Sequence, residues 1–143
     1  MLSNKVKEYC QQKGWWHESV PEEYKTALQS INVDLASDFA EFYLHAEDLH
    51  TFLSRKREIY QVCWFILNSH YQQSVTSAHE SLKLPEAYIP LSTFDEDGFF
   101  YNRSTGEVLH LEVGEKLARL FETGHVTPDW PDFNSFLEWY FER

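Results

Sequence analysis

Apolar residues recur at helical spacing in several segments of the chain, each bounded by residues that start or end helices. In the segment that starts at Ser37 or Asp38, for example, Phe39, Phe42 and Tyr43 fall on one face. This pattern predicts helices over residues 3–14, 19–31, 37–45, 69–84, 115–123 and 132–143. The last two are predicted to bury Leu117, Leu120 and Phe121, and Phe133, Phe136, Leu137 and Tyr140, respectively.

The middle of the chain is rich in β-branched and aromatic residues, which favour strands. The run 51–67 predicts a short strand near Phe52 and a second strand over Ile59–Ile66, although a buried helix fits the second run nearly as well. The segment YIPLSTF predicts another strand. Because it contains Pro90, we expect that strand at a sheet edge or at a bulge.

A hairpin is predicted from residue 99 to residue 111, where FFY and EVLHL flank the polar loop NRSTG. Gly106 can supply the left-handed residue that such a loop requires. Since side chains alternate along a strand, Phe99 and Tyr101 should point to one side of the sheet and Phe100 to the other.

The order of these elements defines the fold class. Helices come first, strands lie in the middle and a helix comes last, which is typical of an α+β protein. The chain has 143 residues, 43% of them hydrophobic, and shows no internal repeat, low-complexity tract or linker. We therefore expect residues 1–143 to form a single domain.

The chain is strongly acidic, with 12 Lys and Arg against 23 Asp and Glu and a net charge of −11. The acids are spread from Glu8 to Glu142, which argues against nucleic acid or an anionic membrane surface as a direct ligand. A basic protein partner fits this charge, and a general gain in solubility explains it equally well.

Two cysteines, Cys10 and Cys63, lack the short spacing of metal or redox motifs, which fits a reducing compartment. The first 14 residues do not form a secretory signal, and no apolar run is long enough to span a membrane. We therefore expect a cytoplasmic protein.

Motifs for metal binding or catalysis are weak. Three consecutive acids, Asp95, Glu96 and Asp97, precede Gly98, but the aromatic residues that follow do not fit a calcium loop. The histidine pairs 45/50 and 70/79 lack the i, i+4 placement of a helical zinc site. There is no GxSxG motif and no glycine-rich phosphate loop. We expect no cofactor and no metal, although a catalytic carboxylate pair stays open.

The three acids also suggest a binding surface. A charged turn beside partly exposed aromatic residues would combine electrostatic steering with a hydrophobic anchor. In the alternative interpretation, Phe99 to Tyr101 are buried in the sheet and Asp95 to Asp97 only keep a turn soluble.

Several segments together resemble the SUKH superfamily, the cell-wall-synthesis-regulator-like family that includes many bacterial toxin-immunity proteins. They are LASDFAEFYLHAEDL, ESLKLPEAYIPLS, DGFFYNRSTGEVLHL and the terminal W-x-x-F-N-S-F-L-E-W-Y-F, and within them Tyr88-Ile89-Pro90, Gly106-Glu107-Val108 and Phe133-x-x-Phe136-Leu137 match the family's motifs. Where the family often has Asn-Gly after an early helix, this chain has His45-Ala46-Glu47-Asp48.

The resemblance implies a central mixed or antiparallel sheet flanked by helices, with the C-terminal helix packed on it. It also implies a non-catalytic protein that binds and neutralises a cognate toxin domain, commonly a nuclease, whose basic cleft would complement the acidic charge. As partner contacts we predict Asp95, Glu96, Asp97, Glu47 and Asp48. A regulatory scaffold of the same fold, or a small hydrolase with a carboxylate pair, are the alternatives.

Overall fold

Seven helices and five strands make up the protein, whose computed structural model describes residues 1–143. In chain order they are α1 (Asn4–Gln12), α2 (Glu22–Ser30), α3 (Asp38–His45), β1 (Thr51–Ser54), β2 (Arg57–Tyr60), α4 (Val62–Asn68), α5 (Tyr71–Glu80), β3 (Tyr88–Pro90), β4 (Asp97–Asn102), β5 (Val108–Glu112), α6 (Glu115–Thr123) and α7 (Phe133–Tyr140). This arrangement confirms the predicted α+β class.

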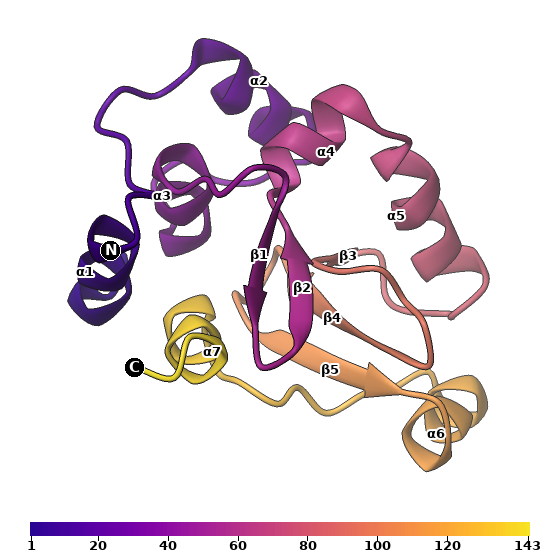
Figure 1. Ribbon diagram of the computed structural model, residues 1–143. Helices are drawn as coiled ribbons and strands as arrows, with labels where there is room; N and C mark the ends of the chain where they lie inside the picture. The colour runs from indigo at the N-terminus through magenta and orange to yellow at the C-terminus, as the bar shows by residue number, and fades with distance from the viewer.

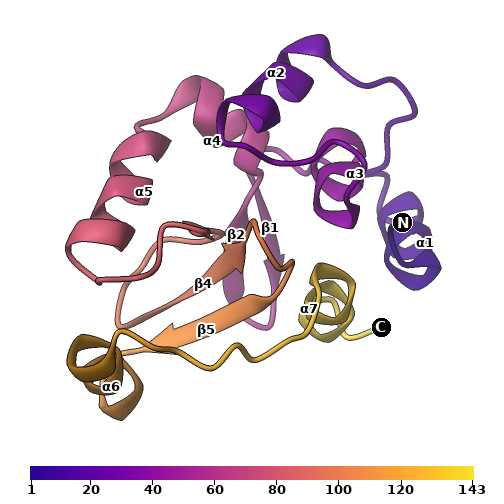
Figure 2. The same ribbon diagram turned by 180° about the vertical axis from the view of Figure 1, so that it is seen from behind.

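The helices surround the strands, and the two ends of the chain lie side by side (Figures 1 and 2). The N-terminal helix α1 lies next to α7, and hydrogen bonds join the ends: Ser3 N donates to Asn134 Oδ1 at 2.8 Å, and Asn134 Nδ2 donates to Met1 O at 2.9 Å. As expected, α7 packs on the sheet, where the Phe136 and Tyr140 rings contact Phe99.

Two antiparallel sheets replace the single central sheet that the resemblance implies. One is the β1–β2 hairpin, and the other has the strand order β3-β4-β5. They are joined where Tyr60 N, at the end of β2, donates to Leu91 O, just after β3, at 2.7 Å. This bond links two sheets that are otherwise separate.

The larger sheet separates two groups of buried side chains, as the alternation in β4 predicts. Phe99 and Tyr101 belong to the large core formed with the helices α3 and α7, and Tyr101 stacks on Phe39 with ring centroids 4.1 Å apart. Phe100 points to the other side, into a smaller cluster with Leu109. The aromatic run that follows the acids is therefore buried, which confirms the alternative interpretation for these three residues.

The outer edge of β3 is closed to further strands. The carbonyl of Tyr88 contacts His79 Nε2 at 2.8 Å, and the carbonyl of Pro90 accepts a hydrogen bond from the Tyr71 hydroxyl at 2.6 Å. Pro90 has no N–H group to offer. The prediction of an edge strand around this proline is confirmed, and α5 supplies the side chains that cap it.

The predicted strand over Ile59–Ile66 is wrong, because the chain changes from strand to helix at Gln61. The Gln61 side chain is fully buried and accepts from Cys63 N at 2.8 Å, while its Nε2 donates to the carbonyls of Tyr43 and Ala46. These bonds start α4 and fix it against the end of α3. Periodicity could not show this, since a short apolar run fits both elements.

Helix α6 is a second correction. Leu120 is buried, but Phe121, which was predicted on the same face, is 53% exposed. The helix follows the end of β5 at the border of the protein (Figure 1), where Leu120 joins the smaller cluster and Leu117 packs against it while only partly buried. The C-terminal stripe is confirmed in full, with all four of its predicted residues buried.

Candidate interaction surface

The three consecutive acids form a fixed turn before β4. Asp95 N donates to Asp97 O at 3.1 Å, and the carbonyl of Glu96 accepts a hydrogen bond from Val113 N at 2.8 Å. Glu96 has a positive φ of 66°, which residues other than glycine seldom adopt. The turn therefore holds the side chains of Asp95 and Glu96 outward, and both are exposed.

Asp97 differs from its two neighbours because its charge is already paired. The Arg57 guanidinium forms an ion pair with Asp97 Oδ2, and His110 Nε2 lies 2.6 Å from the same oxygen. Arg57 belongs to β2 and His110 to β5, so this carboxylate connects both sheets. Its role is structural, and only Asp95 and Glu96 of the three predicted acids are free to meet a partner.

His110 itself is half-buried, and this burial lowers its pKa. The nearby carboxylate of Glu112 raises the pKa, while the positive charges of Arg57 and Lys116 lower it. Since Arg57 already neutralises the Asp97 carboxylate, the short His110–Asp97 contact gives the imidazolium less support than an unpaired acid would. Burial prevails, and the imidazole is favoured in its neutral form.

The other two predicted acids follow α3. Glu47 Oε1 accepts a hydrogen bond from the Tyr24 hydroxyl at 2.7 Å, and burial together with this bond raises the pKa of Tyr24. Glu47 and Asp48 are both half-buried. Glu47 lines one hollow of the surface, and Asp95 and Asp97 line another.

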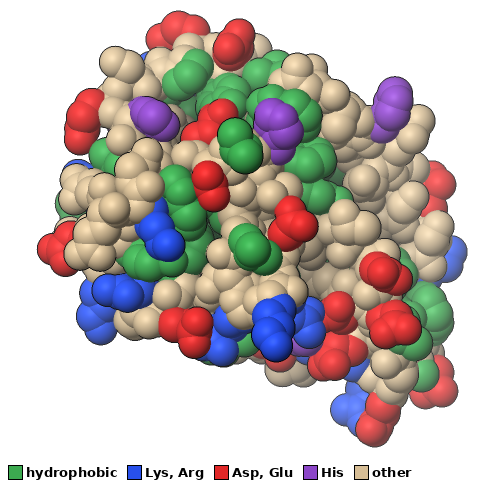
Figure 3. All heavy atoms as spheres, viewed as in Figure 1, with side chains coloured by type: hydrophobic (Ala, Val, Ile, Leu, Met, Phe, Trp, Pro, Cys, Tyr) green, Lys and Arg blue, Asp and Glu red, His purple; other side chains and the backbone are tan.

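The β1–β2 hairpin lies between the two acidic groups. Strand β1 begins three residues after Asp48, and β2 begins at Arg57, the partner of Asp97. Two leucines on this stretch face solvent: Leu49 is 81% exposed and Leu53 is 63% exposed. Figure 3 looks onto this hairpin and shows isolated hydrophobic side chains among acidic ones. We call Asp48, Leu49, Leu53, Glu58, Asp95 and Glu96 the hairpin face.

A hollow of about 490 Å³ lies between the hairpin and the segment 92–98. Thr51, Leu53 and Glu58 line it from the hairpin, and Asp95 lines it from the acidic turn. Thr51 Oγ1 on β1 donates to Glu58 Oε2 on β2 at 2.6 Å, which holds this carboxylate across the hairpin. The hairpin and the acidic turn therefore share one concave surface.

The hairpin tip has the opposite charge. Arg55 and Lys56 both have positive φ, of 53° and 59°, as a type I′ turn requires and as side chains other than Gly, Asn and Asp seldom tolerate. Arg55 is held over the Trp139 ring at 4.3 Å, and its Nε donates to Trp139 O at 2.7 Å. Lys56 is exposed and makes no such contact, and Figure 3 shows the Lys and Arg side chains gathered at this end.

Sequence reasoning missed the two leucines and the basic tip. In the strand TFLS, Leu53 points to the face opposite that of the buried Phe52. The interpretation of residues 51–54 as an amphipathic strand would therefore have predicted that Leu53 faces solvent. Leu49 and the strained tip carry no comparable signal, because both depend on backbone conformations that tertiary packing imposes.

Three of the four histidines considered for zinc, all except His70, are engaged elsewhere. The His45 ring stacks on Trp16, the His50 ring stacks on Trp64 at a centroid distance of 3.7 Å, and His79 caps β3. No group of three or more His, Cys, Asp or Glu side chains is arranged to hold a metal ion. The longest helix, α5, has ten residues, and no helix combines the length and hydrophobicity needed to cross a bilayer.

Comparison with protein-family models, with curated proteins and with solved structures finds no match. The similarity to the SUKH superfamily therefore rests on the sequence motifs alone.

Proposed function

We propose that the protein is an immunity protein that neutralises a cognate toxin domain, most simply a nuclease, by stoichiometric binding through the hairpin face. The observation that carries this proposal is the pair of exposed leucines, Leu49 just before β1 and Leu53 within it, together with the acids before β1 and before β4. The SUKH-like motifs and the net charge of −11 support the same function.

The acids and the leucines of the hairpin face would contribute to binding in different ways. Exposed acids at its rim attract a basic partner and raise the association rate. Leucines near its centre lose water on binding and supply the apolar contact that slows dissociation. A stable complex buries about 1,200–2,000 Å² in total, so we expect the hollow beside the hairpin to take part as well.

The acids do not contribute equally. Asp95 and Glu96 are exposed and make no ion pair, so they should carry most of the electrostatic attraction. Asp97 is neutralised by Arg57, and Glu47 accepts a hydrogen bond from Tyr24. Replacing Asp97 would disturb the junction of the two sheets and would confuse a loss of binding with a loss of structure.

The test is a growth-rescue assay with the toxin domains encoded by neighbouring genes, each expressed with and without this protein. The informative variant is Asp95→Lys with Glu96→Lys, which changes the net charge from −11 to −11 + 4 = −7. The matched control is Glu22→Lys with Glu23→Lys on α2, which makes the same change in charge on exposed acids outside the hairpin face. A third variant, Leu53→Asp, removes the apolar centre and adds an acid.

We expect rescue by the original protein and by the α2 control, and loss of rescue by the other two variants while they stay folded. Binding measured with the purified toxin domain should weaken as salt increases. Equal loss in both double variants would mean that net charge matters and the hairpin face does not. Failure to rescue against every neighbouring toxin would favour the regulatory scaffold.

A further inference from the structure

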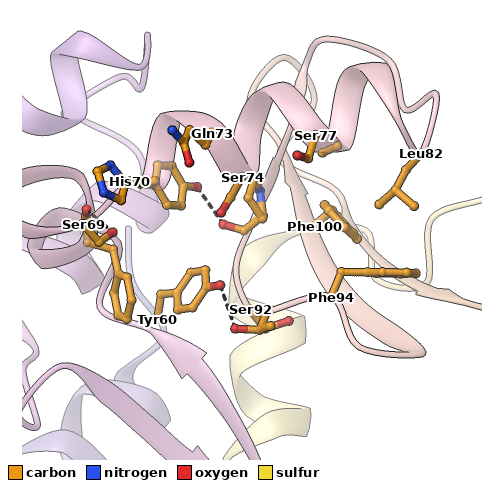
Figure 4. A pocket seen from close by; sticks show the side chains of 15 residues that line it. Tyr60, Ser69, His70, Gln73, Ser74, Ser77, Leu82, Ser92, Phe94 and Phe100 are labelled. Carbon is orange, nitrogen blue, oxygen red and sulfur yellow. Dashed lines mark hydrogen bonds between the residues drawn. The ribbon is translucent and has the colours of Figure 1, made fainter.

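A second hollow lies between α5 and the end of β3, on the far side of Tyr60 from the hairpin face (Figure 4). Its volume is about 480 Å³, within the range of small-molecule sites. Ser74 and Ser77 of α5 form one wall, and Phe94 and Phe100 lie across from them. We call it the serine–aromatic pocket. It is lined by 15 residues: Tyr60, Phe65, Ser69, His70, Tyr71, Gln73, Ser74, Ser77, Ala78, Leu82, Pro90, Ser92, Thr93, Phe94 and Phe100.

The lining of this pocket contains no Asp, Glu, Lys or Arg. This contrasts with the chain as a whole, of which 24% is charged. His70 is the one basic side chain of the lining, so a charged ligand would lose its hydration here with little opposite charge to replace it, which is costly. The pocket therefore fits an uncharged ligand.

Hydroxyl groups make up much of the polar lining, and several of them are free to bind. The side chains of Ser74, Ser77 and Gln73 make no hydrogen bond within the protein. Ser92 Oγ accepts from Phe99 N at 3.0 Å, which leaves its own proton to donate. A purely apolar ligand would cover these groups and leave them unsatisfied, at a cost in affinity.

Aromatic rings make up much of the remaining lining. The rings of Phe94 and Phe100 lie 6.2 Å apart, and those of Tyr60 and Phe65 lie 4.2 Å apart at the other end of the pocket. Gly98 leaves room for the Phe94 ring, since a Cβ at this position would come within 3.1 Å of that ring. The position of the Phe94 ring therefore depends on the absence of a side chain at Gly98.

An added β-strand is not a suitable occupant. The outward carbonyls of β3 already accept hydrogen bonds from His79 and Tyr71, and Pro90 has no N–H group. A peptide would find no backbone partner along this edge.

We propose that the serine–aromatic pocket binds a neutral saccharide. A pyranose ring presents apolar C–H faces to aromatic rings and hydroxyl groups at its edges, and it carries no charge. This combination matches the partly exposed rings of Tyr60, Phe65 and Phe94, with Phe100 buried behind them, opposite the free hydroxyl and amide groups. The residues tested below, Ser74 and Ser77, lie outside the hairpin face and outside the hollow beside it, although the two hollows share Tyr60, Phe65, Ser92 and Thr93.

The test is a titration of the ¹⁵N-labelled protein, followed by NMR, with methyl glucoside, N-acetylglucosamine and cellobiose. Glucuronate tests the requirement for neutrality, and cyclohexanol tests whether an apolar ring suffices. The variant Ser77→Leu blocks one wall of the pocket, and Ser74→Leu blocks it one helical turn away. The matched control is Thr76→Leu, an exposed position on the same helix outside the pocket.

We expect at least one saccharide to cause saturable shifts at Ser74, Ser77 and Phe100, with millimolar affinity. Ser77→Leu and Ser74→Leu should each weaken this binding at least tenfold, and Thr76→Leu should leave it unchanged. Three results would overturn the proposal: no saturable shift with any of the three saccharides, equal binding of glucuronate, or binding of cyclohexanol alone.

Discussion

Tyr140 connects the C-terminal helix to the hairpin, and its hydroxyl should contribute measurably to stability. It accepts a hydrogen bond from Ser54 N at 3.1 Å and lies 2.7 Å from Phe52 O and 2.5 Å from Arg57 O. The single proton of the hydroxyl can serve only one carbonyl at a time. Ser54 Oγ adds a bond to the carbonyl of Tyr140 at 2.5 Å, so α7 holds both ends of the hairpin turn.

The substitution Tyr140→Phe removes this hydroxyl and leaves the ring in place. A buried backbone group that loses its hydrogen-bond partner costs about 1–3 kcal/mol. Because Phe52 O is buried and the Ser54 amide is partly covered, we expect a loss of about 2 kcal/mol in the free energy of unfolding. For a chain of this size the midpoint temperature should fall by roughly 4–8 °C.

Urea denaturation of both proteins measures this loss, and hydrogen exchange at the Ser54 amide reports on the hairpin itself. The matched control is Tyr9→Phe, because the Tyr9 ring also packs on Phe141 while its hydroxyl makes no hydrogen bond. If Tyr140→Phe cost no more than Tyr9→Phe, or if Ser54 exchange were unchanged, the hydroxyl would not anchor the hairpin.

Three further predictions concern the junction of the sheets, the hairpin tip and the start of α4. By NMR titration His110 should show a pKa below its ordinary value of 6.5, and Arg57→Met should raise it by freeing the Asp97 carboxylate. In the original protein the unfolded chain binds the His110 proton more tightly than the folded chain does. The contribution of neutral His110 to the free energy of unfolding should therefore be fully present above about pH 6.5 and should be lost as the pH falls through the lower pKa of the folded state. Lys56→Gly should raise the free energy of unfolding in urea by about 0.5–1 kcal/mol, because glycine accepts the positive φ without strain. Gln61→Ala should lower the thermal midpoint through a loss of about 3 kcal/mol, since it removes a helix cap and leaves two carbonyls without their donor.

Each of these has an outcome that would contradict it. A His110 pKa that is unaffected by Arg57→Met would mean that the guanidinium does not compete for Asp97. Lys56→Ala keeps the Cβ, so a gain equal to that of Lys56→Gly would point to the lost charge and away from backbone strain. Gln61→Glu keeps the shape and the acceptor of the cap but removes the amide donor, so a smaller loss of stability than in Gln61→Ala would mean that the two bonds to the carbonyls do not matter.

The sequence by itself determined the elements whose signal is local. The caps at Ser37 and Asp132 accept hydrogen bonds from Ala40 N and Ser135 N, and the helices that follow begin where the pattern predicts. The hairpin around Gly106 also forms as predicted, because a left-handed residue between two alternating strands leaves few other conformations.

Tertiary structure decided the features that depend on distant residues. The run after Ile59 could be strand or helix, and the buried bonds of Gln61 to the end of α3 select the helix. Among three adjacent acids of equal chemistry, only Asp97 meets Arg57 and His110, so only it loses its free charge. The hairpin face also depends on tertiary structure, since it requires the positive φ of 56° at Leu49 and the position of the hairpin against α7. Neither is encoded in the local pattern, because each is stabilised by contacts between segments that lie far apart along the chain.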